Sequence, residues 1–99
     1  EAYHGIVPVQ AMSGKAITYD VVGPVCESGD WLGRDRSLAV EEGDLLAILS
    51  AGAYGFVMAS NYNTRPKPAE IMVDGKDVYL IRKRENTKDL FASEAVLPK

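Results

Sequence analysis

The feature that most constrains the fold is a β-hairpin signal late in the chain, "EIMVDGKDVYLIRK" at residues 70–83. Two runs of β-branched and aromatic residues flank Asp74-Gly75, a dipeptide that favours the tight turn between antiparallel strands. A chain of 99 residues has room for one modest core. Because a hairpin with so clear a sequence signal would occupy part of that core, we predict a mainly β domain.

Three further segments have strand patterns. "GIVPV" at residues 5–9 predicts a short strand, and its Pro8 places it at a sheet edge or a bulge. "AITYDVV" at 16–22 alternates apolar and polar residues, and "LLAILS" at 45–50 is a continuous apolar run that predicts a buried strand. With turn signals between them, five or six short strands are expected, which is typical of a small antiparallel, Greek-key-like barrel or sandwich.

The remaining segments predict loops and short helices. "GPVCESGDWLGRDR" at 23–36 predicts one long ordered loop, because it is rich in glycine and charged residues. Apolar residues at helical spacing predict a short helix within 54–62, after a turn at Gly52. "TRPKP" is expected to be extended. "NTKDLFASE" at 86–94 predicts a small helix that Asn86 and Asp89 cap.

Charge and composition exclude several classes of function. A net charge of -3 argues against nucleic-acid binding, which normally needs a basic face. No apolar run approaches the roughly 20 residues of a membrane helix, and the first residues lack the pattern of a signal peptide. The single cysteine forms no internal disulfide and is compatible with a reducing, cytoplasmic location. Because the chain begins at Glu1 instead of methionine, we expect a piece of a longer protein.

The single cysteine, Cys26, stands directly before Glu27 in a loop of small residues. Adjacent residues of a regular strand point to opposite faces, so a site that uses both side chains needs irregular backbone. An unperturbed thiol has a pKa near ~8.5 and is mostly protonated at neutral pH, so it can donate a proton. The alternatives are a small buried apolar cysteine and a surface carboxylate. Asp30 is interpreted as a residue that caps the turn.

Three other cysteine chemistries are disfavoured. A cysteine protease needs a histidine near Cys26, and the only histidine is His4. A zinc site needs about four ligands, which one cysteine and one histidine do not supply. A redox motif needs a second cysteine.

Tyr54 is a second candidate, because its neighbours Ala53 and Gly55 leave its ring uncovered. A phenol in this setting can stack on a flat ligand and use its hydroxyl as a polar group, and the alternative is a core tyrosine. For residues 61–63 and Arg65 a structural role is favoured, with side-chain hydrogen bonds that shape a turn and an acidic partner for the arginine.

Two segments, "VVGPVCESGD" and "GDLLAILSAGAYGFVMASNYNTRPKPAEIMV", together resemble the C-terminal domain of the diaminopimelate decarboxylase family. The resemblance covers nearly the whole chain and depends on both segments in this order. It implies that residues 1–99 are a C-terminal β-domain whose N-terminal (β/α)8 barrel lies outside this chain. It also implies a pyridoxal 5'-phosphate enzyme that converts meso-2,6-diaminopimelate to L-lysine and carbon dioxide.

The resemblance further implies a homodimer with shared active sites. Cys26 is then the proton donor in the partner subunit's site, Glu27 binds the far ammonium of the substrate, and Tyr54 contacts cofactor and substrate. No lysine of the chain matches a cofactor-binding motif, so the cofactor is expected mainly on the barrel domain. The lysines are Lys15, Lys67, Lys76, Lys83, Lys88 and Lys99. By itself the chain is expected to be inactive and to expose apolar surface that the barrel covers.

Two alternatives remain open. The first is the same domain of a decarboxylase of ornithine, arginine or another basic amino acid, although such enzymes more often have aspartate after the cysteine. The second is a non-catalytic β-module that binds a partner.

Overall fold

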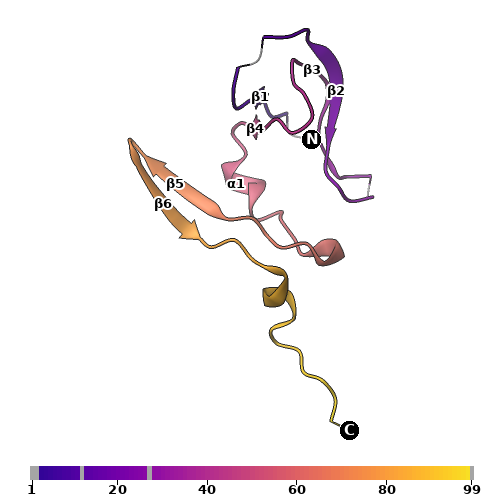
Figure 1. Cartoon of the computed structure of the whole chain (residues 1–99), viewed down its shortest axis with the longest axis vertical. Helices are drawn as coiled ribbons and strands as arrows, with labels where there is room; N and C mark the ends of the chain where they lie inside the picture. Colours follow the sequence, from indigo (N-terminus) through magenta and orange to yellow (C-terminus); the bar gives the residue numbers. More distant parts are fainter. Residues whose placement is uncertain (1–2, 12, 27, 99) are drawn as a thin grey trace. The chain divides into compact units, whose positions relative to one another are not determined.

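The structure is a computed structural model that describes residues 3–11, 13–26 and 28–98. The chain divides into two compact units, Glu1–Ala51 and Gly52–Lys99. Figure 1 shows four strands, β1 to β4, in the first unit. The second unit holds two strands, β5 and β6, and three short helical segments, α1, η1 and η2.

The first unit consists of two antiparallel strand pairs. β1 (Ile6–Pro8) pairs with β4 (Leu46–Ile48), and β2 (Ile17–Val22) pairs with β3 (Trp31–Leu38). The strands predicted within 5–9, 16–22 and 45–50 are therefore confirmed. β4 is half-buried instead of fully buried.

The predicted loop at 23–36 is wrong in its second half, because Trp31 begins an eight-residue strand. A bulge hides this strand in the sequence. Tyr19 lies opposite Arg36, but Val21 lies opposite Gly33, so two residues of β3 face one residue of β2. The bulge therefore changes which side chains of β3 point inward.

Asp35 is the residue that adopts the unusual backbone of this bulge, with a φ of 54° in the left-handed region. The side chain of Asp20 supports it, since Oδ1 accepts a hydrogen bond from the Asp35 N–H at 3.0 Å. The extra residue thus keeps a partner for its backbone donor despite leaving the regular ladder.

The core of the first unit is small. Ile6 and Leu38 are the buried apolar side chains of the described residues, and Gly33 lies against Ile6. Arg36 is also buried, and its Nη1 donates to the carbonyl of His4 at 2.7 Å. Its guanidinium lies over the ring of Tyr3, 4.0 Å from the centroid. Arg36 therefore ties the first described residues of the chain to β3.

In the second unit, β5 (Glu70–Asp74) and β6 (Asp77–Arg82) form the predicted hairpin. Asp74 pairs with Asp77, so the connecting loop has two residues. Gly75 opens this loop with a φ of 60°, a conformation that glycine adopts without strain. The hairpin signal in the sequence is therefore confirmed.

The helical segments are shorter than predicted. α1 (Gly52–Gly55) is a single turn, so the apolar spacing across 54–62 does not form one continuous helix. η1 (Tyr62–Thr64) and η2 (Thr87–Phe91) are 3₁₀ turns. The predicted cap of the last segment is confirmed, because Asn86 and Asp89 each accept a hydrogen bond from the other's backbone N–H.

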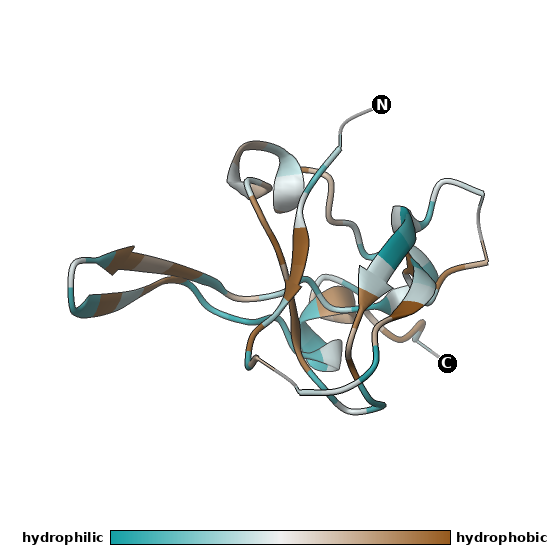
Figure 2. Cartoon of the chain, turned by 90° about the horizontal axis from the view of Figure 1, so that it is seen from above, coloured by the Kyte–Doolittle hydropathy of each residue, from teal (hydrophilic) through white to brown (hydrophobic). Residues whose placement is uncertain are grey.

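The described residues form three two-stranded antiparallel sheets, and none of these sheets closes into a barrel. The mainly β class is confirmed. Many large apolar side chains are exposed, above all along β5 and β6, where Figure 2 shows brown segments on both strands. The expected exposure of apolar surface is therefore observed. Within the described residues, no helix has the length and apolar character that crossing a membrane requires.

Candidate functional site

The candidate loop, residues 23–30, connects the paired ends of β2 and β3. Val22 lies opposite Trp31, and the Gly23 N–H donates to the carbonyl of Asp30 at 2.9 Å, which closes the base of the loop. The side chain of Asp30 turns into the loop, where Oδ2 accepts a hydrogen bond from the Val25 N–H at 2.6 Å. Asp30 therefore caps the turn, as the sequence predicts.

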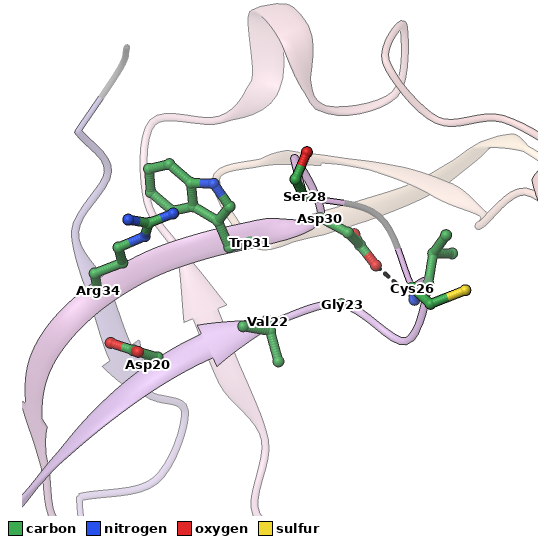
Figure 3. A pocket seen from close by; sticks show the side chains of 9 residues that line it. Asp20, Val22, Gly23, Cys26, Ser28, Asp30, Trp31 and Arg34 are labelled. Atoms are coloured by element: carbon green, nitrogen blue, oxygen red, sulfur yellow. Dashed lines mark hydrogen bonds between the residues drawn. The ribbon is translucent and has the colours of Figure 1, made fainter.

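A cleft of about 550 Å³ lies beside this loop, within the first unit (Figure 3). Its lining combines the ends of β2 and β3 with the loop between them. The lining residues are Asp20, Val22, Gly23, Val25, Cys26, Ser28, Asp30, Trp31 and Arg34. The strand pair thus places a thiol, a hydroxyl and three charged groups around one concave surface.

The charged groups occupy different parts of the cleft. The guanidinium of Arg34 lies over the ring of Trp31, 4.3 Å from the ring centroid, and Figure 3 shows this pair on β3. Asp20 belongs to β2, and its Oδ1 holds the Asp35 N–H of the bulge. A cation stacked on indole at an exposed site gains about 0.5–1 kcal/mol, enough to favour one orientation of the arginine. The described part of the lining thus contains two carboxylates and one guanidinium.

Cys26 is exposed, and Figure 3 shows its sulfur on the outer side of the loop. The interpretation as a buried apolar cysteine is therefore wrong for this chain. Its thiol is available to a molecule that approaches from outside the unit, which a proton donor needs. Glu27, the second residue of the predicted pair, lies outside the described residues.

Tyr54 belongs to the second unit, where it lies on α1 with 71% of its surface exposed. The core-tyrosine interpretation is therefore wrong as well. The backbone carbonyl of Tyr54 accepts a hydrogen bond from the Met58 N–H at 3.2 Å, which continues the turn beyond the helix. Its ring is free to contact a ligand or another chain.

A carboxylate supports the segment that follows Tyr54. Glu85 Oε1 accepts the Lys67 N–H at 2.7 Å and the Asn61 side-chain amide at 2.8 Å. The backbone hydrogen bond from Lys67 lowers the pKa of Glu85 most, and the side-chain hydrogen bond from Asn61 lowers it further. Asn61 also donates to the carbonyl of Arg65, as its predicted turn role requires. The ion pair among the described residues joins Arg82 to Glu70, so the predicted acidic partner of Arg65 stays a prediction.

A sequence model of one protein family, described as "Pyridoxal-dependent decarboxylase, C-terminal sheet domain", matches residues 1–52. The chain belongs to this family. The matched residues contain all four strands of the first unit, the candidate loop and the cleft beside it. The family match therefore covers the part of the sheet domain that carries Cys26.

Curated relatives and solved structures extend the similarity to the second unit. The diaminopimelate decarboxylase of Vibrio cholerae is 58% identical over 98 residues, which are 99% of this chain and 24% of that protein. The crystal structure of AQ1208 from Aquifex aeolicus matches with a TM-score of 0.88 and 48% identity, over 97% of this chain and 24% of that one.

The structure of the M. jannaschii diaminopimelate decarboxylase in co-complex with L-lysine has a TM-score of 0.88 and 45% identity, over 98% of this chain and 22% of that one. The sheet domain thus spans about a quarter of the length of the relatives it matches.

The described residues do not fit a pyridoxal phosphate site by themselves. A lysine would have to hold the aldehyde of the cofactor, and no lysine is among the described residues that line the cleft. The described lining residues include one cation, Arg34, and two carboxylates, Asp20 and Asp30, so the charge of the lining disfavours a phosphate. Across the described residues, no group of three His, Cys, Asp or Glu side chains lies as a metal site would need.

The sequence did not identify Asp20, Trp31 and Arg34 as residues of the site. All three lie on β2 or β3 and close in sequence to the loop at residues 23–30, so proximity along the chain was the available signal. The bulges that bring them together depend on the register of β2 and β3, which no local pattern reveals.

Proposed function

We propose that the sheet domain is the C-terminal domain of a diaminopimelate decarboxylase, which releases carbon dioxide from meso-2,6-diaminopimelate to form L-lysine. The supporting observation is 58% identity over 99% of the chain to an enzyme of that name. Pyridoxal 5'-phosphate is then held by an N-terminal (β/α)8 barrel, and the enzyme is a cytoplasmic homodimer. This family's cofactor supplies the electron sink, and the residues of this chain supply the remaining chemistry.

Cys26 supplies the proton that replaces the departing carboxylate. When the bond between the α-carbon and the carboxylate breaks, the electron pair stays on that carbon. The S–H bond of Cys26 then breaks, its proton forms the new C–H bond, and solvent later returns a proton to the thiolate. The exposed position of Cys26 on a capped loop supports this role, because a general acid has to reach the reacting carbon.

Glu27 and Tyr54 select and hold the substrate. A carboxylate at position 27 binds the far ammonium of a diamino diacid through a charge-assisted hydrogen bond. Tyr54, with an exposed ring on α1, contacts the cofactor and the substrate. Cys26 and Glu27 enter the site of the partner subunit, so each active site needs two chains.

The substrate assignment is tested with the full-length enzyme that carries this domain. Release of carbon dioxide is measured with meso-diaminopimelate, ornithine, arginine and lysine at equal concentrations. We expect turnover of the diacid at least about tenfold above that of the others, because a site with fixed polar partners rejects substrates that leave them unpaired. Preference for ornithine or arginine would replace the proposed substrate, and no turnover of any amino acid would indicate a non-catalytic module.

The role of Cys26 is tested by Cys26→Ala in the same enzyme, with Ser13→Ala as the control, because Ser13 is exposed and lies outside the loop and the cleft lining. We expect kcat to fall about 10²–10⁴-fold while KM changes little, since general acid catalysis contributes that much. Ser13→Ala should leave kcat within about twofold. A Cys26→Ala enzyme with normal turnover would exclude the thiol as the proton donor.

The shared site is tested by mixing two inactive enzymes. One carries Cys26→Ala, and the other lacks the lysine of the barrel that holds the cofactor. A heterodimer then contains one site with both intact halves, so the mixture should regain up to about a quarter of wild-type activity, as random exchange of subunits predicts. A mixture that exchanges subunits but stays inactive would show that each site is formed by one chain.

A further inference from the structure

The loop that carries Cys26 is fixed at two points by one residue. The carbonyl of Asp30 accepts the Gly23 N–H at 2.9 Å, and its Oδ2 accepts the Val25 N–H at 2.6 Å. Figure 3 shows the carboxylate directed across the loop to the residue before Cys26. The second hydrogen bond is charge-assisted, and such bonds are about twice as strong as neutral ones. Asp30 thus fixes the peptide unit next to the one that carries the thiol.

Gly23 leaves room for this carboxylate. A Cβ placed at position 23 would overlap both oxygens and the carboxyl carbon of Asp30. The φ of Gly23 lies outside the left-handed region, so the position requires space and not an unusual backbone conformation. Gly23 and Asp30 therefore form one device, in which the absence of a side chain lets a carboxylate reach the opposite limb of the loop.

We propose that Asp30 is a positioning residue that acts through Cys26, with Gly23 as its necessary complement. This inference depends on the proposed role of Cys26 as proton donor. The loop consists largely of small and turn-forming residues, so without the hydrogen bond to Val25 its backbone reaches more conformations. A displacement of about 1 Å in a catalytic group costs up to about 10²-fold in rate. Loss of the Asp30 carboxylate should therefore slow proton transfer.

A turn elsewhere in the first unit provides the control. Asp44 Oδ2 accepts the Glu41 N–H at 2.8 Å, which is the same type of bond at a turn that carries no proposed catalytic residue. If the carboxylate of Asp30 only stabilised the domain, Asp30→Ala and Asp44→Ala should have similar effects on activity. If Asp30 positions Cys26, the two variants should differ in kcat.

The test uses the full-length enzyme with meso-diaminopimelate as substrate. We expect Asp30→Ala to lower kcat about tenfold or more and Asp44→Ala to lower it less than about twofold. Asp30→Asn keeps an oxygen that accepts the Val25 N–H and should restore most of the loss. Combining Asp30→Ala with Cys26→Ala should lower kcat no further than Cys26→Ala alone, because residues that act as a unit are not additive.

The Gly23 part of the device has its own prediction. Gly23→Ala should lower kcat, because the new methyl group displaces the carboxylate of Asp30. The double variant Gly23→Ala and Asp30→Ala should be no slower than Asp30→Ala alone, since the two changes remove the same contact. If the losses in kcat of the two single variants multiply in the double variant, Gly23 and Asp30 are not coupled.

Two results would overturn the proposal without affecting the proposed function. One is equal kcat for Asp30→Ala and Asp44→Ala, and the other is multiplying losses for Asp30→Ala and Cys26→Ala. In both cases Cys26→Ala alone still lowers kcat. If Cys26→Ala leaves kcat unchanged, the proton-donor role is wrong, and the positioning role of Asp30 is wrong with it.

Discussion

The two antiparallel hairpins of this domain are built in opposite ways. β5 and β6 are joined by two residues and keep regular pairing along most of their length. β2 and β3 are joined by the eight residues 23–30, and their register shifts twice. The β5–β6 hairpin has a glycine where the backbone needs a positive φ. The β2–β3 hairpin has glycines where neighbouring groups need space. The irregular hairpin is the one that carries Cys26.

The difference between the two hairpins indicates what the irregular pairing of β2 and β3 contributes to the site. A two-residue turn leaves no backbone free to carry a side chain outward, whereas a long loop does, provided that other groups fix it. In the first unit, Asp30 fixes the loop, and Asp20 holds the N–H of the bulge residue Asp35. The loop and the bulge at Asp35 thus each have a carboxylate that accepts a backbone N–H.

The largest expected effect is at Gly33, the buried glycine of β3. A Cβ there would meet Ile6 Cδ1 at 2.8 Å and the Cζ of Arg36 at 2.9 Å. We expect Gly33→Ala to lower the free energy of opening of the β2–β3 hairpin by about 1–3 kcal/mol, as overpacking does in other cores. The measurement is amide hydrogen exchange of β3 in the full-length enzyme.

Gly14→Ala is the matched control for this change, since nothing lies within 4 Å of a Cβ at position 14. It should change the same exchange rates little, because it adds no contact in the folded state. Equal protection of β3 in both variants would mean that Ile6 and Arg36 make room for the added methyl group without cost to the hairpin.

A smaller effect is expected at Gly75, in the turn of the regular hairpin. Nothing crowds a Cβ there, but the φ of 60° disfavours an L-residue. We expect Gly75→Ala to cost about 1 kcal/mol in the exchange of β6 amides and Gly75→Asn less, because asparagine tolerates the left-handed region better. At Gly33, where space is limiting, asparagine should be no better than alanine. The reverse ranking at either position would contradict the distinction between the two glycines.

The regular hairpin was predictable from the sequence because its determinants are local. Asp74-Gly75 and the flanking β-formers specify a turn and two strands without reference to the rest of the chain. The same holds for the cap formed by Asn86 and Asp89, which are three residues apart. In both cases the interacting groups are near in sequence, so the pattern and the structure agree.

β3 was not predictable in this way, because polar residues and a bulge interrupt its alternation. Gly33 and Arg36 are its buried residues on either side of the bulge, a spacing of three that no strand pattern contains. The same limit applied to the site. Cys26 was recognisable as the single cysteine beside a carboxylate, but the cleft walls, Trp31 and Arg34, depend on a register that only the folded chain shows.

The smallest expected effect concerns Glu85, which accepts the Lys67 N–H in the second unit as Asp30 accepts that of Val25 in the first. The pKa of Glu85 is lowered from its usual value of 4.5, mainly by the Lys67 hydrogen bond. A lowered folded-state pKa adds stability above the unfolded pKa, and that stability is lost as the pH falls through the folded pKa. The thermal midpoint of wild type should therefore exceed that of Glu85→Gln at pH 7, and the difference should shrink below about pH 4.5.

Glu94→Gln is the control for Glu85, since among the described residues its carboxylate has no hydrogen-bond partner, although its backbone N–H donates to Phe91. Glu94→Gln should leave the thermal midpoint unchanged both at pH 7 and below about pH 4.5. The effect of Glu85→Gln itself should be small, because the Glu85 side chain is only partly buried and water screens its interactions. A difference that grows as the pH falls would mean that Glu85 is more strongly bound in its protonated form. That result would break the analogy between Glu85 and Asp30 as ionised acceptors of backbone N–H groups in the two units.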